Sequence, residues 1–288
     1  MMTAGQTSLS RRSAVIAAAL LCTVSLALGA HAALNKRVPD GGKTAATEQS
    51  TATSGNAARL ALVVGNAHYP DANAPLAQPI NDARALTGAL RRDGFDVDVV
   101  EDATKEDMAR AVARLTSRIR PDSVVMLFFG GYAIQAGRES YMIPVDAKIW
   151  RESDVRREGT SIEGLLDAVR EQGARAKLVV VDASRRNPYE RRFRSYSHGL
   201  APINAPANAL ILSSATPGKV LDDPRDRSNS MLVSELLNQL GRSPSAEAVF
   251  TKTRNAIARS TDGEQVPMVS SSLVEDVRLS ADVANAGS

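Results

Sequence analysis

The chain has 288 residues, of which 43% are hydrophobic and 23% are charged, and its formal net charge is +3. This balance is typical of a folded globular protein and excludes a wholly disordered chain. Arg11 and Arg12 are the only charged residues among the first 32, so the remainder carries 33 basic and 32 acidic side chains. Such a nearly neutral chain gives no electrostatic reason to expect a nucleic-acid partner.

The N-terminus has the features of an export signal. The two arginines precede an apolar run over residues 14–29, which is short for a membrane span and ends in the small-residue pattern Ala30-His31-Ala32. We therefore predict a cleaved signal peptide over residues 1–32 and an extracytoplasmic, periplasmic location. The paired arginines are typical of the twin-arginine route, but the residues that flank them match its motif only in part, so Sec export stays open as the alternative. An uncleaved anchor is the alternative; after cleavage we expect no contact with a membrane.

Cysteine chemistry depends on the same segment. Cys22 is the only cysteine and lies within the apolar run. Cleavage would leave a mature chain without a thiol nucleophile, a disulfide or a cysteine-ligated metal.

The remaining elements alternate between strands and helices. Residues 33–57 are rich in Ala, Thr, Ser and Gly without an apolar period, which predicts a flexible linker. Short apolar runs predict strands at 59–65, 95–100, 123–129, 176–181 and 209–213. Apolar residues at helical spacing predict helices at 79–93, 105–119 and 161–171, each between two of these strands. Two further helices, at 229–240 and 246–259, are predicted after the last strand. The pattern predicts a three-layer α/β domain over residues 58–280, with a mostly parallel sheet of about six strands, helices on both faces and a tail at 281–288.

Ligands of such sheets bind beyond the carboxyl ends of the strands. The segments expected there are 65–66, 130–133, 182–185 and 216–218. No strand is followed by a phosphate-binding glycine pattern, so nucleotide binding is unsupported. We expect no cofactor and no metal.

Several short segments stand in order along this domain: LVVGN at 62–66 with Tyr69, NDA at 81–83, YMIPVDA at 141–147, DAS at 182–184 and ATPG at 215–218. In order and spacing they resemble the caspase-like peptidase family, close to bacterial metacaspase-like proteins, over about residues 59–279. The resemblance implies a caspase-like fold and a cysteine endopeptidase that works by a Cys/His dyad.

Both members of that dyad are replaced. The family's His turn after the third strand reads Gly131-Tyr132-Ala133, and its Cys turn after the fourth reads Asp182-Ala183-Ser184. A serine hydroxyl needs a base within hydrogen-bond reach, and a neutral tyrosine with a pKa of about 10 offers almost no basic form near pH 7. These substitutions predict an inactive peptidase.

Binding can survive such a loss. The resemblance implies that Asp82 and Asp182 line a pocket for a basic Arg or Lys side chain, and that the backbone N–H groups of Ala133 and Ser184 form an oxyanion hole. The alternatives are a first-turn helix acid for Asp82 and a turn cap for Asp182. His68 follows the first strand and could approach Ser184, but we expect a solvated loop histidine.

The function predicted is therefore an exported pseudopeptidase that binds a peptide or protein with basic residues. Two alternatives stay open: a hydrolase with Ser184 as nucleophile and Tyr132 as base, and a purely structural module. We expect the Arg-rich segment to be a solvated loop, although a patch for an anionic partner or a cleavage site would have the same composition. Its arginines are Arg185, Arg186, Arg191, Arg192 and Arg194.

Overall fold

The computed structural model describes residues 58–72, 75–186, 188–189, 200–221, 227–243 and 245–279. By contacts the chain divides into Met1–Ala52 and Thr53–Ser288, and all described residues belong to the second unit. The predicted signal peptide, linker and C-terminal tail lie outside the described residues, as do Arg191, Arg192 and Arg194 of the arginine-rich segment.

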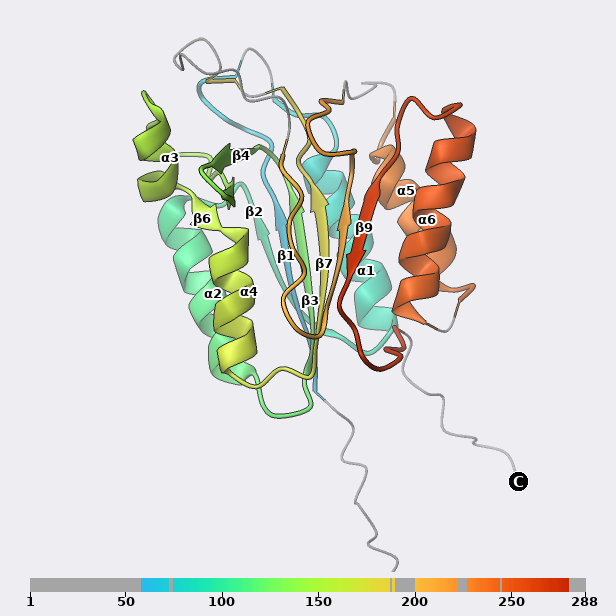
Figure 1. The fold of residues 1–288 in the computed structure, drawn as a ribbon. Helices are drawn as coiled ribbons and strands as arrows, with labels where there is room; N and C mark the ends of the chain where they lie inside the picture. Colours follow the sequence, from blue (N-terminus) through green and yellow to red (C-terminus); the bar gives the residue numbers. More distant parts are fainter. Residues whose placement is uncertain are drawn as a thin grey trace, which may run out of the picture. The chain divides into compact units, whose positions relative to one another are not determined.

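A six-stranded sheet forms the centre of this unit (Figure 1). Its order is β2 (Asp96–Glu101), β1 (Arg59–Gly65), β3 (Val124–Gly130), β7 (Ala176–Asp182), β8 (Ala209–Ser213) and β9 (Met268–Ser271). The first five strands are parallel and β9 is antiparallel to β8. The prediction of a mostly parallel sheet of about six strands is confirmed.

Helices cover both faces of the sheet, also as predicted (Figure 1). One apolar core lies under α1 (Pro79–Arg92), α5 (Met231–Leu240) and α6 (Ala246–Ser260), and the other under α2 (Lys105–Arg118) and α4 (Ile162–Glu171). Alternate residues of the buried strands enter opposite cores, since successive side chains of a strand point to opposite faces. Three layers result.

A smaller antiparallel sheet and a short helix were not predicted. The sheet pairs β4 (Ala133–Ala136), β5 (Glu139–Met142) and β6 (Thr160–Ser161), and the helix is α3 (Glu152–Glu158). The β4–β5 turn contains Gly137 at φ +72°, a left-handed conformation that glycine adopts without a steric cost. A two-residue Gly-Arg turn between short runs is a hairpin signal that could have revealed this element.

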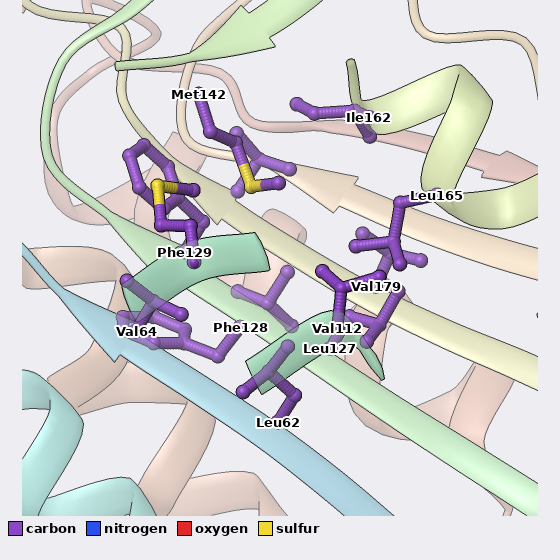
Figure 2. A pocket seen from close by; sticks show the side chains of 13 residues that line it. Leu62, Val64, Val112, Leu127, Phe128, Phe129, Met142, Ile162, Leu165 and Val179 are labelled. Carbon is purple, nitrogen blue, oxygen red and sulfur yellow. The ribbon is translucent and has the colours of Figure 1, made fainter. Parts of the chain in front are cut away.

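A small hollow lies within the core under α2 and α4, at the sheet face (Figure 2). Its volume is about 20 Å³, and its lining from β1, β3, β5, β7 and the two helices is apolar and includes Met108 and Met142. A space of this size and polarity is a packing gap, because a small apolar cavity gives water or a ligand no polar partner. A functional site is therefore expected at the strand ends, outside this hollow.

Among the helices that the structure describes, none has the length and apolar character of a membrane span.

Candidate active site

Three strands end side by side at the predicted crevice. Gly65 of β1 pairs in register with Gly130 of β3, which pairs with Asp182 of β7. The turns that follow these three strands therefore begin at the same level, along one edge of the sheet. This register brings the Tyr132 turn and the Ser184 turn to neighbouring strands.

The end of β1 also fixes the start of α1. A Cβ at Gly65 would lie 2.4 Å from the carbonyl oxygen of Pro79 and 2.9 Å from Cβ of Ala83. Only a glycine permits this close approach of helix and strand. The contact places Asp82, one turn into α1, beside the strand ends.

Tyr69 supports the turn after β3 through hydrogen bonds of its hydroxyl. Its hydroxyl donates to the carbonyl of Ile143 at 3.0 Å and accepts the N–H of Tyr132 at 3.1 Å. Asn66 adds a side-chain bond to the same Ile143 carbonyl at 3.1 Å. Burial raises the pKa of Tyr69 well above its usual value, against the hydrogen bond from Tyr132. Tyr69 is thus a neutral side chain that links the Tyr132 turn to Ile143 by hydrogen bonds.

Tyr132 packs into an aromatic and aliphatic cluster. Its ring meets the ring of Tyr69 edge-on, with centroids 4.7 Å apart and an interplanar angle of 64°. Tyr132 is 8% exposed, and its neighbours in the cluster include Ile134, Ile143 and Tyr189. Such packing fixes the position of the ring within a cluster of apolar and aromatic side chains.

Ser184 lies in the neighbouring turn and is buried. It is 4% exposed, and its carbonyl accepts the N–H of Leu221 at 2.7 Å. None of the described residues places a base within hydrogen-bond distance of its Oγ. The roles given to Tyr132 and Ser184, and to the backbone N–H groups of Ala133 and Ser184, stay predictions.

His68 binds a carboxylate that the sequence did not suggest. Its Nδ1 lies 2.7 Å from Oδ2 of Asp102, while Oδ1 of Asp102 accepts the N–H groups of Ala67 and His68. Burial would raise the pKa of Asp102, but these hydrogen bonds lower it. Asp102 follows β2, on the side of β1 away from β7. His68 is therefore held toward β2 and not toward Ser184, although it is exposed as expected.

Asp82 and Asp182 are both buried and lie close enough to affect each other. Asp82 is 0% exposed; its Oδ1 accepts Asn229 Nδ2 at 2.8 Å and the N–H of Ser230 at 3.0 Å. Burial raises its pKa to about 7, and the charge of Asp182 adds to the rise. Neither Oδ2 of Asp82 nor Oδ2 of Asp182 has a hydrogen-bond partner in the described part of the chain. Buried acceptors of this kind are costly unless a donor reaches them.

Arg185 contradicts the prediction of a solvated arginine-rich loop at its own position. It is 6% exposed, whereas Arg186 is exposed as predicted. Its Nη1 donates to the carbonyls of Gly131, at 3.2 Å, and Asp182, and lies 3.7 Å from Oδ1 of Asp182. Two carbonyls and the Asp182 carboxylate hold the guanidinium, so composition alone gave the wrong environment for this residue.

The site is thus a buried acidic pair, Asp82 and Asp182, beside the turns that carry Tyr132 and Ser184, at the carboxyl edge of an α/β sheet. Within the described ranges, no group of three or more His, Cys, Asp or Glu side chains converges as a metal site. Two buried carboxylates are chemically suited to a cationic group, and none of the described residues stands as a base at the Ser184 hydroxyl.

Comparison with known proteins gives the class. The family model of the caspase domain of peptidase family C14 matches residues 58–278, and the chain therefore belongs to this family. The resemblance that the crevice segments indicated is confirmed. Over 134 residues the chain is 27% identical to mucosa-associated lymphoid tissue lymphoma translocation protein 1 of Homo sapiens and to its Mus musculus homolog. The match covers 46% of this chain and only 16% of each relative.

Proposed function

We propose that this caspase-domain protein is a catalytically inactive member of its family that binds basic peptide segments through Asp82 and Asp182. The observation that supports this is the pair of buried carboxylates, each with one oxygen that no described donor reaches. A guanidinium or ammonium group supplies both the missing donors and the missing charge. We further propose that the protein acts outside the cytoplasm, after removal of residues 1–32.

Inactivity follows from the chemistry of the two turns. The ring of Tyr132 packs against Tyr69 in an apolar cluster, and Ser184 is buried without a described base at its hydroxyl. A serine in this setting stays protonated and is a weak nucleophile. The hydrolase with Ser184 as nucleophile is the competing function, and the same assay decides between the two.

The test uses the purified full-length chain with peptides that carry Arg or Lys before the bond to be cleaved. We expect no turnover and saturable binding by calorimetry. Asp82→Asn should weaken binding by about tenfold or more, since it removes a buried charge from the contact. Asp167→Asn, the same change on the exposed face of α4, should leave binding unaltered.

Binding should also depend on pH. Because cation binding requires the ionised form of Asp82, whose pKa is about 7, affinity should rise with pH. The ionised fraction grows about tenfold between pH 6 and pH 8, and the association constant of the wild type should follow it. The Asp82→Asn variant should lack this rise.

Two results would count against the proposal. Turnover that disappears in Ser184→Ala would establish the hydrolase instead. A chain that neither cleaves nor binds these peptides would be the structural module.

A further inference from the structure

A second cavity lies at the edge of the sheet where the parallel strands begin, which is the lower edge in Figure 1. Its lining includes Ala176 at the start of β7 and Asn208, the residue before β8. Its volume is about 340 Å³, within the range of about 300–1,000 Å³ that is usual for small-molecule sites. Tyr132 and Ser184 follow the opposite ends of the strands, so this cavity is separate from the candidate active site.

Part of the lining is apolar. It consists of Ala176, Leu273, Val274 and Val277, which we call the apolar wall. Ala176 and Val277 are buried, whereas Val274 is 80% exposed, more than any other large hydrophobic side chain that the structure describes. Because removal of apolar surface from water is favourable, an aliphatic group of a ligand would gain free energy by covering this wall.

The rest of the lining is polar and carries charges of both signs. It consists of Asp122, Arg175, Asn208 and Glu275. Nη1 of Arg175 lies 3.7 Å from Oε2 of Glu275, which is too far for a hydrogen bond, and both side chains are exposed, so this ion pair is weak. The carboxylate of Asp122 and the side-chain amide of Asn208 make no hydrogen bond or ion pair with the described residues. The cavity therefore offers a ligand an anion, a weakly paired cation and an amide.

Two of these polar residues hold a backbone conformation that most side chains avoid. Asp122 has φ +72° and Asn208 has φ +56°. Four of the described residues other than glycine have a positive φ, and two of the four line this cavity. Glycine would adopt this conformation at a lower cost, so polar side chains at both positions point to a role for them.

We propose that this cavity binds a free α-amino acid with an aliphatic side chain, such as leucine. The ammonium group pairs with Asp122, the carboxylate pairs with Arg175, and the aliphatic side chain covers the apolar wall. A guanidinium can bind a carboxylate through two parallel hydrogen bonds, which the 3.7 Å contact with Glu275 does not provide. The amide of Asn208 can donate to the carboxylate or accept from the ammonium group. An amino acid carries all three groups on one carbon atom, which suits a cavity near the lower size limit for small-molecule sites.

The experiment measures the binding of L-leucine to the purified full-length chain by calorimetry. Three analogues each lack one group: 4-methylpentanoate lacks the ammonium group, 3-methylbutylammonium lacks the carboxylate, and glycine lacks the aliphatic side chain. We expect each analogue to bind at least about tenfold more weakly than leucine, since each loses one charged contact or the apolar one.

Two variants identify the contacts. Asp122→Asn, which introduces a residue type that also tolerates a positive φ, and Arg175→Gln should each weaken leucine binding at least about tenfold. Arg175→Gln should also bind leucine and 3-methylbutylammonium equally, because these two ligands differ only in the carboxylate. A variant that merely disturbs the fold would weaken the binding of both ligands and keep the difference between them.

Asp262→Asn and Arg170→Gln are the matched controls. Asp262 is an exposed turn residue with φ +49°, and Arg170 is an exposed arginine of α4. Neither residue lines the cavity, so both variants should bind leucine as the wild type does.

Absence of saturable leucine binding below about 10 mM would overturn the proposed amino-acid site, since a ligand of this size should reach at least that affinity in a site that it fits. Leucine binding that neither Asp122→Asn nor Arg175→Gln weakens would overturn it too, as would equal binding of leucine and 4-methylpentanoate. The cavity and the acidic pair share no residue, so each of these results is independent of the peptide binding proposed above.

Discussion

Replacing Asp82 by Asn is expected to stabilise the protein at pH 8 while it weakens the proposed binding of cations. The carboxyl of Asp82 has a pKa of about 7 in the folded chain, mainly because it is buried and also because Asp182 is near. An unfolded aspartate has a pKa of about 3.9. Between these values the folded state holds a proton that the unfolded state has lost, so the stability of the wild type falls as pH rises from about 4 to about 7.

Asparagine cannot ionise and escapes that loss. Its Oδ1 can still accept the hydrogen bonds from Asn229 and Ser230. Its amide nitrogen would replace Oδ2, a buried acceptor that has no hydrogen-bond donor among the described residues. Three pKa units correspond to about 4 kcal/mol, and we expect a gain of about 2–4 kcal/mol at pH 8 that shrinks toward zero near pH 4. Urea unfolding of both proteins across this range measures the difference directly.

Asp107→Asn is a control variant in which the expected change in stability at pH 8 has the opposite sign. Hydrogen bonds from the Thr104 side chain and backbone, and from Arg110, lower the pKa of Asp107. Its ionised form therefore stabilises the folded chain, and the variant should be less stable than the wild type at pH 8 but not at low pH. An Asp82→Asn variant that is less stable than the wild type at pH 8 would make Asp82 a structural residue and would remove the main support for a cation site. A gain in stability with a loss of binding is the behaviour expected of a functional carboxylate.

Much of the fold follows from simple patterns in the sequence. Buried strands such as Val124–Gly130 are continuous apolar runs, and amphipathic helices such as α4 repeat apolar residues at helical spacing, so both were predicted within a residue or two. The strands β4, β5 and β6 have four residues or fewer, and β9 pairs antiparallel at the sheet edge. Segments this short carry too few residues to show a period.

The site was predictable only in part, because its contacts join residues that lie far apart in the sequence. Parallel strand ends meet at one edge, and this rule was enough to bring the Tyr132 and Ser184 turns together. The same rule would have suggested the pair of His68 and Asp102, which follow adjacent strands, but Asp102 has φ +48° and no sequence pattern marked that turn. The burial of Arg185 depends on the carbonyls of two different turns, so its arginine-rich surroundings pointed to the wrong environment.

Removal of one hydroxyl, in Tyr69→Phe, is expected to destabilise the chain by about 1–3 kcal/mol, which is the cost of leaving one buried donor unsatisfied. The hydroxyl accepts the N–H of Tyr132 and donates to the carbonyl of Ile143. The carbonyl of Ile143 keeps its bond from Asn66, so the orphaned group would be the N–H of Tyr132. That loss falls on the turn after β3, which carries Tyr132.

Tyr141→Phe is the matched control, because its hydroxyl donates to the side chain of Glu139 at a partly buried position and not to the backbone of the site. It should change stability by less than about 0.5 kcal/mol. The loss of stability in Tyr69→Phe should also be the same from pH 5 to pH 8, because the raised pKa of Tyr69 keeps its hydroxyl protonated throughout this range. The effect of Asp82→Asn, in contrast, should change with pH. Equal stability of the two variants in urea would mean that Tyr69 does not support the turn. In that case the position of Tyr132 would depend on its ring packing alone.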